Sequence, residues 1–336
     1  MEAKKDVANA PLLAALKLAL GAVGVVGDET DWWGWTGAAF RCYWTRLPLW
    51  CPSNLQRCET PFYLWLSEAI GHRVEPCLNW EWEPFQARVR ESTRRGLPVV
   101  VSGLWGGLEW SVVWKAEEAW HLSLGDGSEE CLWEPRGGWK GYLFGPASLG
   151  LWGQHPALFL GEPCPSPKRA LLNRRALEAA ERLAEPGQEG FCAKGLLAYE
   201  AWATALRDHR EFADSHPKEM ERRAWMNAAL LGTLMDERQR AARFLRRMAA
   251  EAPWAIARLL EDAGRHYEEA AHCLADARRV LPYPLEGPAE QALQQAVEAL
   301  ADRERREAAA ESLLAARAME ASAIHQIRRV LQQWPP

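Results

Sequence analysis

The spacing of apolar residues divides the chain into two parts with different periods. Up to about residue 162, short segments with helical spacing come first, and β-branched or alternating segments follow. The helices are expected at residues 11–20, 38–45, 60–70 and 83–95, and the strands at residues 97–103, 108–115, 119–124, 141–144 and 157–161. Helices followed by a run of neighbouring strands predict an α+β domain with an antiparallel sheet.

The second part has long segments with apolar residues at the helical period, rich in Ala, Leu, Glu and Arg. It predicts an all-α helical bundle. The Pro-rich stretch at residues 161–167 can continue neither a helix nor a central strand, so two domains are expected, at 1–162 and 163–336. Helices are expected at residues 168–184, 190–208, 217–250 with a break near Met235-Asp236, 253–278, 288–301 and 303–333.

Tryptophan is concentrated in the first part, because fifteen of the nineteen tryptophans lie at or before Trp152. This shift in composition supports the predicted domain boundary. So many large rings cannot all be wholly buried. Most of them either fill a core that is poor in Phe and Ile or line an aromatic cleft that binds sugars, planar rings or cations. The partly exposed ones line such a cleft or an interface between the two halves.

Charge and targeting signals narrow the classes of partner. The net charge is −5 and basic residues are interleaved with acidic ones, so no nucleic-acid partner is expected. The apolar stretch at residues 11–26 is too short for a bilayer and contains Lys17, and no cleavage site follows it. The sequence therefore predicts a cytoplasmic protein without a membrane partner.

Cofactor and metal motifs do not emerge from the sequence. The eight cysteines include no CxxC pair, which indicates reduced and mostly buried thiols. Glu269 and His272 fit the Glu-x-x-His spacing of di-metal bundles once, without a second copy. We therefore expect no metal and no cofactor. The amphipathic helix at residues 303–333 is expected to pack on the bundle or to pair with a second copy in a homodimer.

Several short motifs occur in an order that is familiar from a known family. They are Trp33-Gly-Trp-Thr-Gly-Ala-Ala-Phe-Arg41, Gly96-Leu-Pro-Val-Val-Val101, Glu109-Trp-Ser-Val-Val-Trp114 and a turn that contains Asp126. On these motifs, residues 10–162 resemble the papain-like C39 peptidase superfamily. They are most similar to the N-terminal domain of the butirosin biosynthesis protein H family, whose members often carry a helical C-terminal half. Tyr199-Glu-Ala-Trp202 resembles a recurring motif of that half.

The resemblance implies a catalytic triad that this sequence does not retain. The family uses a cysteine thiolate at a helix start, a histidine base at a strand start and a carboxylate that orients the base. The matching positions hold Thr36, Glu109 and Asp126. A threonine hydroxyl stays protonated without a strong base. The pKa of a glutamate, ordinarily about 4.3, would have to rise for Glu109 to act as a base.

Three functions remain open from the sequence. The first is a catalytically degenerate protein that binds a small molecule or peptide in a cleft at the former active site. The cleft would be lined by Trp33, Trp35, Gly37, Arg41, Trp105 and Trp110. The second is an acyltransferase or amide hydrolase that uses Thr36 and Glu109. The third is a structural protein that oligomerises. If there is no catalysis, Thr36 is expected to cap the start of a helix, and Glu109 to pair with an arginine or to line a pocket.

Overall fold

The protein forms two compact units. The computed structural model describes residues 11–45, 62–77, 82–102, 110–117, 119–124, 129–133, 157–189, 192–213, 215–284 and 289–334. Among them, residues up to Trp32 and from Phe62 to Lys168 form the first unit. Residues from Trp33 to Thr45 and from Arg169 onward form the second.

This division differs from the predicted one in two respects, both in the second unit. The predicted domains meet at residue 162, whereas the second unit also contains residues 33–45, and its helical part begins at Arg169. The physical reason is a set of buried hydrogen bonds. The guanidinium of Arg238 donates to the backbone carbonyls of Ala39 and Arg41, at 3.0 and 2.8 Å.

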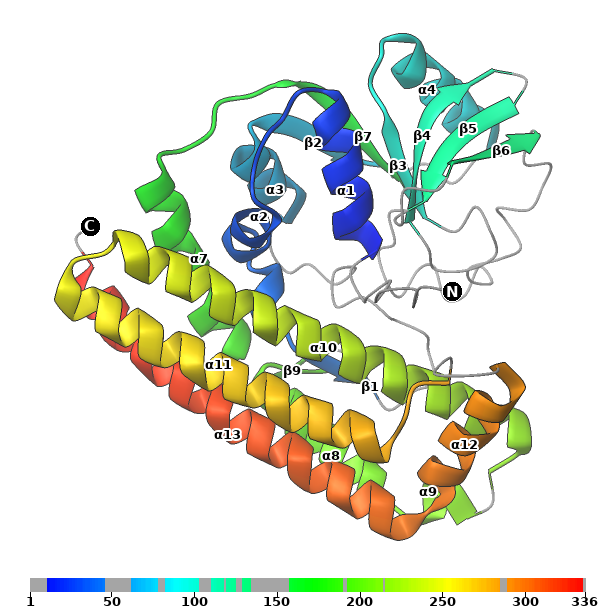
Figure 1. The fold of residues 1–336 in the computed structure, drawn as a ribbon, viewed down its shortest axis with the longest axis vertical. Coiled ribbons are helices and arrows are strands. Elements are labelled where there is room, and N and C mark those ends of the chain that lie inside the picture. Colours follow the sequence, from blue (N-terminus) through cyan, green and yellow to red (C-terminus); the bar gives the residue numbers. More distant parts are fainter. Residues whose placement is uncertain are drawn as a thin grey trace, which may run out of the picture. The chain divides into compact units, whose positions relative to one another are not determined.

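The first unit is built around a six-stranded antiparallel sheet (Figure 1). In spatial order its strands are β2 (His72–Pro76), β7 (Ala157–Pro163), β3 (Val99–Ser102), β4 (Trp110–Ala116), β5 (Ala119–Leu124) and β6 (Glu129–Trp133). The unit also contains the helices α1 (Pro11–Ala22), α3 (Phe62–Ile70) and α4 (Trp82–Arg94) and the first residues of α2 (Glu29–Trp35). An α+β arrangement in this region, with helices and an antiparallel sheet, is therefore confirmed.

The strand β3 of this sheet is buried on both faces. Val99 and Val101 of β3 belong to a core cluster with Phe85 and Val89 of α4, while the intervening Val100 is also fully buried. Because successive strand residues point to opposite faces, both sides of β3 are covered. The helix α1 packs against β3 and β4 through an almost wholly apolar sequence.

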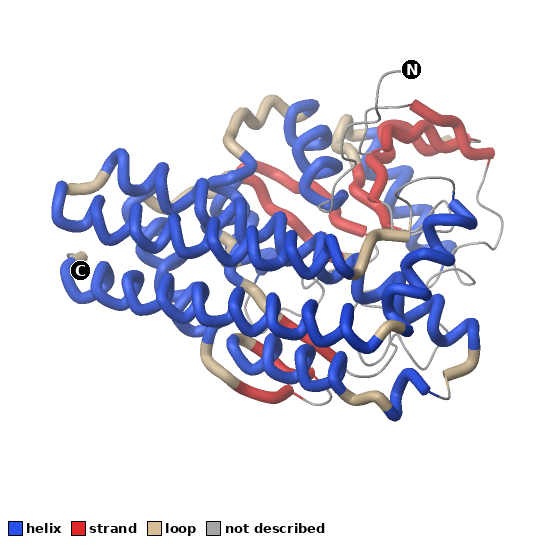
Figure 2. Tube along the Cα trace, turned by 60° about the horizontal axis from the view of Figure 1, so that its bottom comes forward, coloured by secondary structure: helices blue, strands red, loops and turns tan. Residues whose placement is uncertain are grey.

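The second unit is mainly a helical bundle, which confirms a helical C-terminal half. Three long helices, α10 (Pro217–Glu251), α11 (Trp254–Val280) and α13 (Arg303–Gln333), lie side by side in both views (Figures 1 and 2). Around them lie the shorter helices α7 (Arg169–Ala184), α8 (Leu196–Arg207), α9 (Arg210–Ala213) and α12 (Ala289–Ala301). None of the helices in the described ranges combines the length and apolar character needed to cross a membrane.

A small antiparallel sheet joins residues 33–45 to this bundle. Its strands lie in the order β1 (Tyr43–Thr45), β9 (Cys192–Lys194) and β8 (Gly187–Glu189). The predicted helix at residues 38–45 is therefore wrong: a 3-10 turn, η1 (Ala38–Phe40), precedes β1. Pairing between Trp44 and Ala193 overrides the local helical spacing.

The other predicted elements have mixed outcomes. The helices expected at 11–20, 60–70, 83–95, 253–278 and 303–333 and the strands at 97–103, 108–115, 119–124 and 157–161 are confirmed within a few residues. The break near Met235-Asp236 is wrong, because α10 continues through it with Leu234, Arg238 and Ala241 buried along one face. The helix expected at 190–208 starts only after β9. The strand expected at 141–144 lies outside the described residues.

Candidate functional site

Thr36, the residue at the predicted nucleophile position, is part of the interior. It is 0% exposed, and its hydroxyl donates to the carbonyl oxygen of Trp33 at 3.1 Å. The next residue, Gly37, has φ = 74°, a left-handed conformation, and it rather than Thr36 is the N-cap of η1. The hydroxyl of Thr36 therefore closes the end of α2 rather than facing solvent. Glu109 and Asp126 lie outside the described residues.

The residues predicted to line the former active-site cleft are mostly buried where they are described. Trp33, Gly37, Arg41 and Trp110 are buried, and Trp105 lies outside the described ranges. Trp35 is partly exposed, and its Nε1 donates to Asn173 Oδ1 at 2.7 Å. Trp33 and Trp110 also belong to different compact units.

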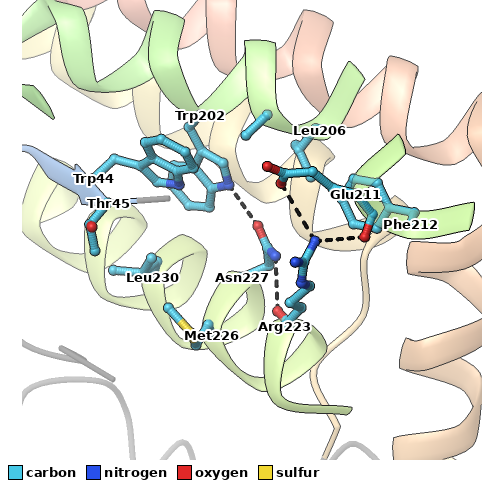
Figure 3. A pocket seen from close by; sticks show the side chains of 11 residues that line it. Trp44, Thr45, Trp202, Leu206, Glu211, Phe212, Arg223, Met226, Asn227 and Leu230 are labelled. Carbon is cyan, nitrogen blue, oxygen red and sulfur yellow. Dashed lines mark hydrogen bonds and ion pairs between the residues drawn. The ribbon is translucent and has the colours of Figure 1, made fainter. Parts of the chain in front are cut away.

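A pocket does exist within the second unit, at a place that the sequence did not predict. We name it the Trp44–Trp202 pocket after two of its tryptophans (Figure 3). The space within its outline is about 440 Å³ including open solvent, and the centres of water-sized spheres can occupy about 50 Å³ of it. Its lining comes from β1, α8, α9 and α10 and comprises Trp44, Thr45, Trp202, Ala205, Leu206, Glu211, Phe212, Arg223, Met226, Asn227 and Leu230.

Gly195 fixes the relative positions of two elements that form the pocket. It lies between β9 and α8, and its N–H donates to the carbonyl oxygen of Cys42 at 2.9 Å, just before β1. Its φ is 59°, and a Cβ there would lie 2.4 Å from the carbonyl oxygen of Glu185. Only glycine fits this conformation and this space. The strand that carries Trp44 is thereby held beside the helix that carries Trp202.

A chain of hydrogen bonds crosses one side of the pocket (Figure 3). Trp202 Nε1 donates to Asn227 Oδ1 at 2.6 Å, and Asn227 Nδ2 donates to the carbonyl oxygen of Arg223 at 2.9 Å. The indole N–H can only donate, which fixes the orientation of the Asn227 amide. These two hydrogen bonds use one N–H and one oxygen lone pair of the Asn227 amide, so they leave its second N–H and its second lone pair unused.

The charged side chains in the lining neutralise each other. Arg223 Nη1 donates to the carbonyl oxygen of Glu211 at 2.9 Å and lies 3.5 Å from its carboxylate. Arg223 Nε donates to Glu219 Oε1 at 3.2 Å. Among the described lining residues, Arg223 and Glu211 are the only charged ones, so this part of the pocket wall carries no net charge.

Phe212 is held between two arginines at the end of the pocket. The guanidinium carbons of Arg223 and Arg306 lie 5.5 and 4.2 Å from its ring centroid. The buried Arg306 donates to the carbonyl oxygens of Leu206, at 3.0 Å, and Leu300, at 2.8 Å, near the ends of α8 and α12. Burial lowers the pKa of Arg306 from its ordinary value. These contacts keep the ring of Phe212 in one place.

Thr45 leaves a polar group unsatisfied in the pocket wall. The residue is 8% exposed, and its Oγ1 has no hydrogen-bond partner within the described part of the chain. A buried hydroxyl without a partner is unfavourable, and such groups in native proteins often mark a site for a ligand, ion or water.

A buried ion pair lies in the interior of the same unit. Arg238 and Glu320 are both 0% exposed, and two N–H···O bonds of 2.8 Å join them. The hydroxyl of Tyr199 donates to Glu320 Oε2 at 2.6 Å. Burial lowers the pKa of Arg238, but the carboxylate of Glu320 together with the nearby Tyr199, Cys42 and Tyr267 outweighs it and raises that pKa well above its ordinary value. Arg238 therefore keeps its positive charge inside the protein.

Cys42 does not provide the nucleophile that the resemblance would require. The thiol is buried beside this ion pair, and burial raises its pKa well above the ordinary value, an effect that the charge of Arg238 opposes. A nucleophilic cysteine needs a lowered pKa and access to solvent. Cys42 has neither.

In the Glu-x-x-His motif of α11, formed by Glu269 and His272, the glutamate lies against a different histidine, His266. His266 Nδ1 lies 3.2 Å from Glu269 Oε2, one turn apart. In the described ranges, no three His, Cys, Asp or Glu side chains gather in a way that would hold a metal ion.

The sequence contains two signals that belong to the pocket, but it does not show that they meet in the fold. The Tyr199-Glu-Ala-Trp202 motif stands out in the sequence, and Trp44 is one of the many early tryptophans.

No protein-family model matches the chain, and a comparison with curated proteins likewise finds no match.

Proposed function

We propose that this protein binds a small molecule in the Trp44–Trp202 pocket and does so without catalysing a reaction. The observation that carries the proposal is the lining itself. Partly exposed aromatic side chains, Trp44 and Phe212, face a space with an apolar base and a few fixed polar groups. Apolar pockets with a small number of placed polar groups are typical of small-molecule sites.

We also infer that the sheet-containing unit is a degenerate relative of the papain-like C39 peptidases. The order of helices before an antiparallel sheet supports this inference, as does the motif around Trp110, whereas the motif around Thr36 lies in the other unit. The burial of the Thr36 hydroxyl, together with its bond to Trp33, argues against an acyltransferase or hydrolase that would use it as a nucleophile.

The proposal can be tested with a metabolite screen on the full chain, read by thermal denaturation. A ligand at 100 times its Kd should stabilise the folded state by about 2.7 kcal/mol. The variant Trp44→Leu should lose most of the shift in Tm. The matched control is Trp254→Leu, because Trp254 lies in the same unit, is 73% exposed and is outside the pocket lining.

Two results would contradict this function. One is a screen in which no compound stabilises the protein. The other is a set of ligands whose effect survives Trp44→Leu as fully as it survives Trp254→Leu. Turnover of a bound compound that Thr36→Val abolishes would instead support the enzyme that we reject.

A further inference from the structure

The pocket wall indicates a chemical class of ligand. We infer that the Trp44–Trp202 pocket takes an uncharged planar ring that carries a hydroxyl or similar group able to hydrogen-bond with Thr45. This inference rests on the proposed binding function and adds the ligand's shape, charge and polar contact.

The shape follows from the aromatic side chains. Trp44 and Trp202 lie next to each other at one end of the pocket, and Phe212 lies at the other (Figure 3). Leu206, Met226 and Leu230 supply the apolar surface between them. Flat rings pack against aromatic faces and edges with a gain beyond the burial of apolar area. A thin, planar ligand therefore fits this lining better than a branched aliphatic one.

The charge follows from the pairing of Arg223. Its guanidinium is already engaged by two acceptors on Glu211 and by Glu219. A carboxylate ligand would have to compete with Glu211 for this guanidinium, and an ammonium ligand would meet Arg223 as a like charge. Either charged ligand would also lose hydration without gaining a dedicated counter-ion in the described lining.

The polar contact follows from Thr45. Its Oγ1 is the buried side-chain oxygen of the lining that has no partner in the described chain, and a hydroxyl can both donate and accept one hydrogen bond. This oxygen is covered by neighbouring atoms, so a ligand hydroxyl would satisfy it once the Thr45 side chain turns about its Cα–Cβ bond toward the pocket. The amide of Asn227 offers a second contact, because Trp202 and Arg223 use only part of its capacity.

Four one-ring probes separate these features. Phenol is uncharged and can hydrogen-bond, toluene is uncharged and cannot, benzoate is an anion, and benzylammonium is a cation. Binding to the full chain is measured by ligand-observed NMR titration. Phenol is expected to bind at least several-fold more tightly than toluene, and both charged probes at least tenfold more weakly than phenol.

Thr45→Val tests the contact itself, since it removes the hydroxyl and keeps the shape. It should bring the affinity for phenol down to that for toluene and leave toluene unchanged. Thr36→Val is the matched control, because Thr36 is buried outside the pocket and its hydroxyl is already bonded. It should leave both affinities as they are.

The outcomes separate this inference from the function on which it rests. An equal or tighter affinity for a charged probe, or a phenol-to-toluene ratio that Thr45→Val does not change, overturns the ligand class. If phenol fails to bind while other compounds of the screen bind in a Trp44-dependent manner, the class is wrong and the binding function stands. If no compound binds at all, both fall.

Discussion

Two threonines in one segment provide a matched test of the hydrogen bonding described above. Thr36 and Thr45 both lie in residues 33–45 of the second unit, and they are 0% and 8% exposed. Thr36 donates to the carbonyl oxygen of Trp33, whereas Thr45 Oγ1 has no partner in the described chain. The same substitution to valine removes one hydroxyl at each site, so the two variants differ mainly in what that hydroxyl contacts.

The expected effects have opposite signs. Thr36→Val loses a hydrogen bond whose net contribution is about 0.5–1.5 kcal/mol. Thr45→Val removes a buried group whose lack of a partner costs about 1–3 kcal/mol. For a domain of roughly 150–250 residues, about 1 kcal/mol moves Tm by about 2–4 °C. We therefore expect Thr36→Val to lower Tm by a few degrees and Thr45→Val to raise it by a similar amount.

The assay is differential scanning calorimetry of the full chain. A protein with two compact units need not unfold in one step, so the transition of the second unit must be identified first. Leu313→Ala serves for this, because Leu313 is buried in α13 and its truncation should cost about 2–5 kcal/mol. If Thr45→Val lowers this transition as much as Thr36→Val does, the hydroxyl of Thr45 has a partner, and the argument for a ligand contact there is refuted.

Three further predictions concern the interior. Glu320→Gln leaves the buried guanidinium opposite it without a counter-ion, and the free energy of unfolding, measured by urea denaturation, should fall by about 3–5 kcal/mol. Gly34→Ala places a Cβ 2.3 Å from the ring of Phe244. The Tm of this variant should therefore fall by an amount equivalent to about 1–3 kcal/mol. An unchanged Tm would show that the end of α2 can shift to make room for the methyl group. Stability should also decline in alkaline solution. Burial raises the pKa of Cys42 and Tyr199 in the folded state, so the unfolded state loses these protons first. This stability is complete below the unfolded pKa values, about 8.5 and 10, and decreases as pH rises above them; melts between pH 7 and 10.5 that show no decline would contradict it.

Elements whose signal is local could be predicted from the sequence. The strand Ala119–Leu124 was located by its alternating pattern. The helix Arg303–Gln333 was located by its uninterrupted period, and the side chain of Asp302 caps its start by accepting from the N–H groups of Glu304 and Arg305. Each of these segments contains enough information in its own residues.

Elements decided by distant partners could not be predicted. Residues 38–45 have helical spacing, but β1 forms because Tyr43, Trp44 and Thr45 pair with residues 192–194. The pocket has the same origin, since Trp44 and Trp202 are brought together by β9 and Gly195, far along the chain. The composition of the chain signals an excess of tryptophan, but it does not say which rings meet.

The pocket and the buried ion pair are built on the same two pieces of chain. On α8, Tyr199 donates to Glu320, and Trp202, one turn later, lines the pocket. In the other segment, the carbonyl of Arg41 accepts from Arg238, and Thr45 lines the pocket a few residues later.

A buried ion pair contributes little net stability compared with a well-packed apolar replacement, but its hydrogen bonds are satisfied in one geometry only. Here that geometry fixes α8 and the approach to β1 against α10 and α13 at the same time. The pair therefore holds α8, which carries Trp202, and the chain just before β1, which carries Trp44. A ligand that enters between these tryptophans and Phe212 meets walls whose positions are already determined, which favours a molecule of matching shape over one that must rearrange them.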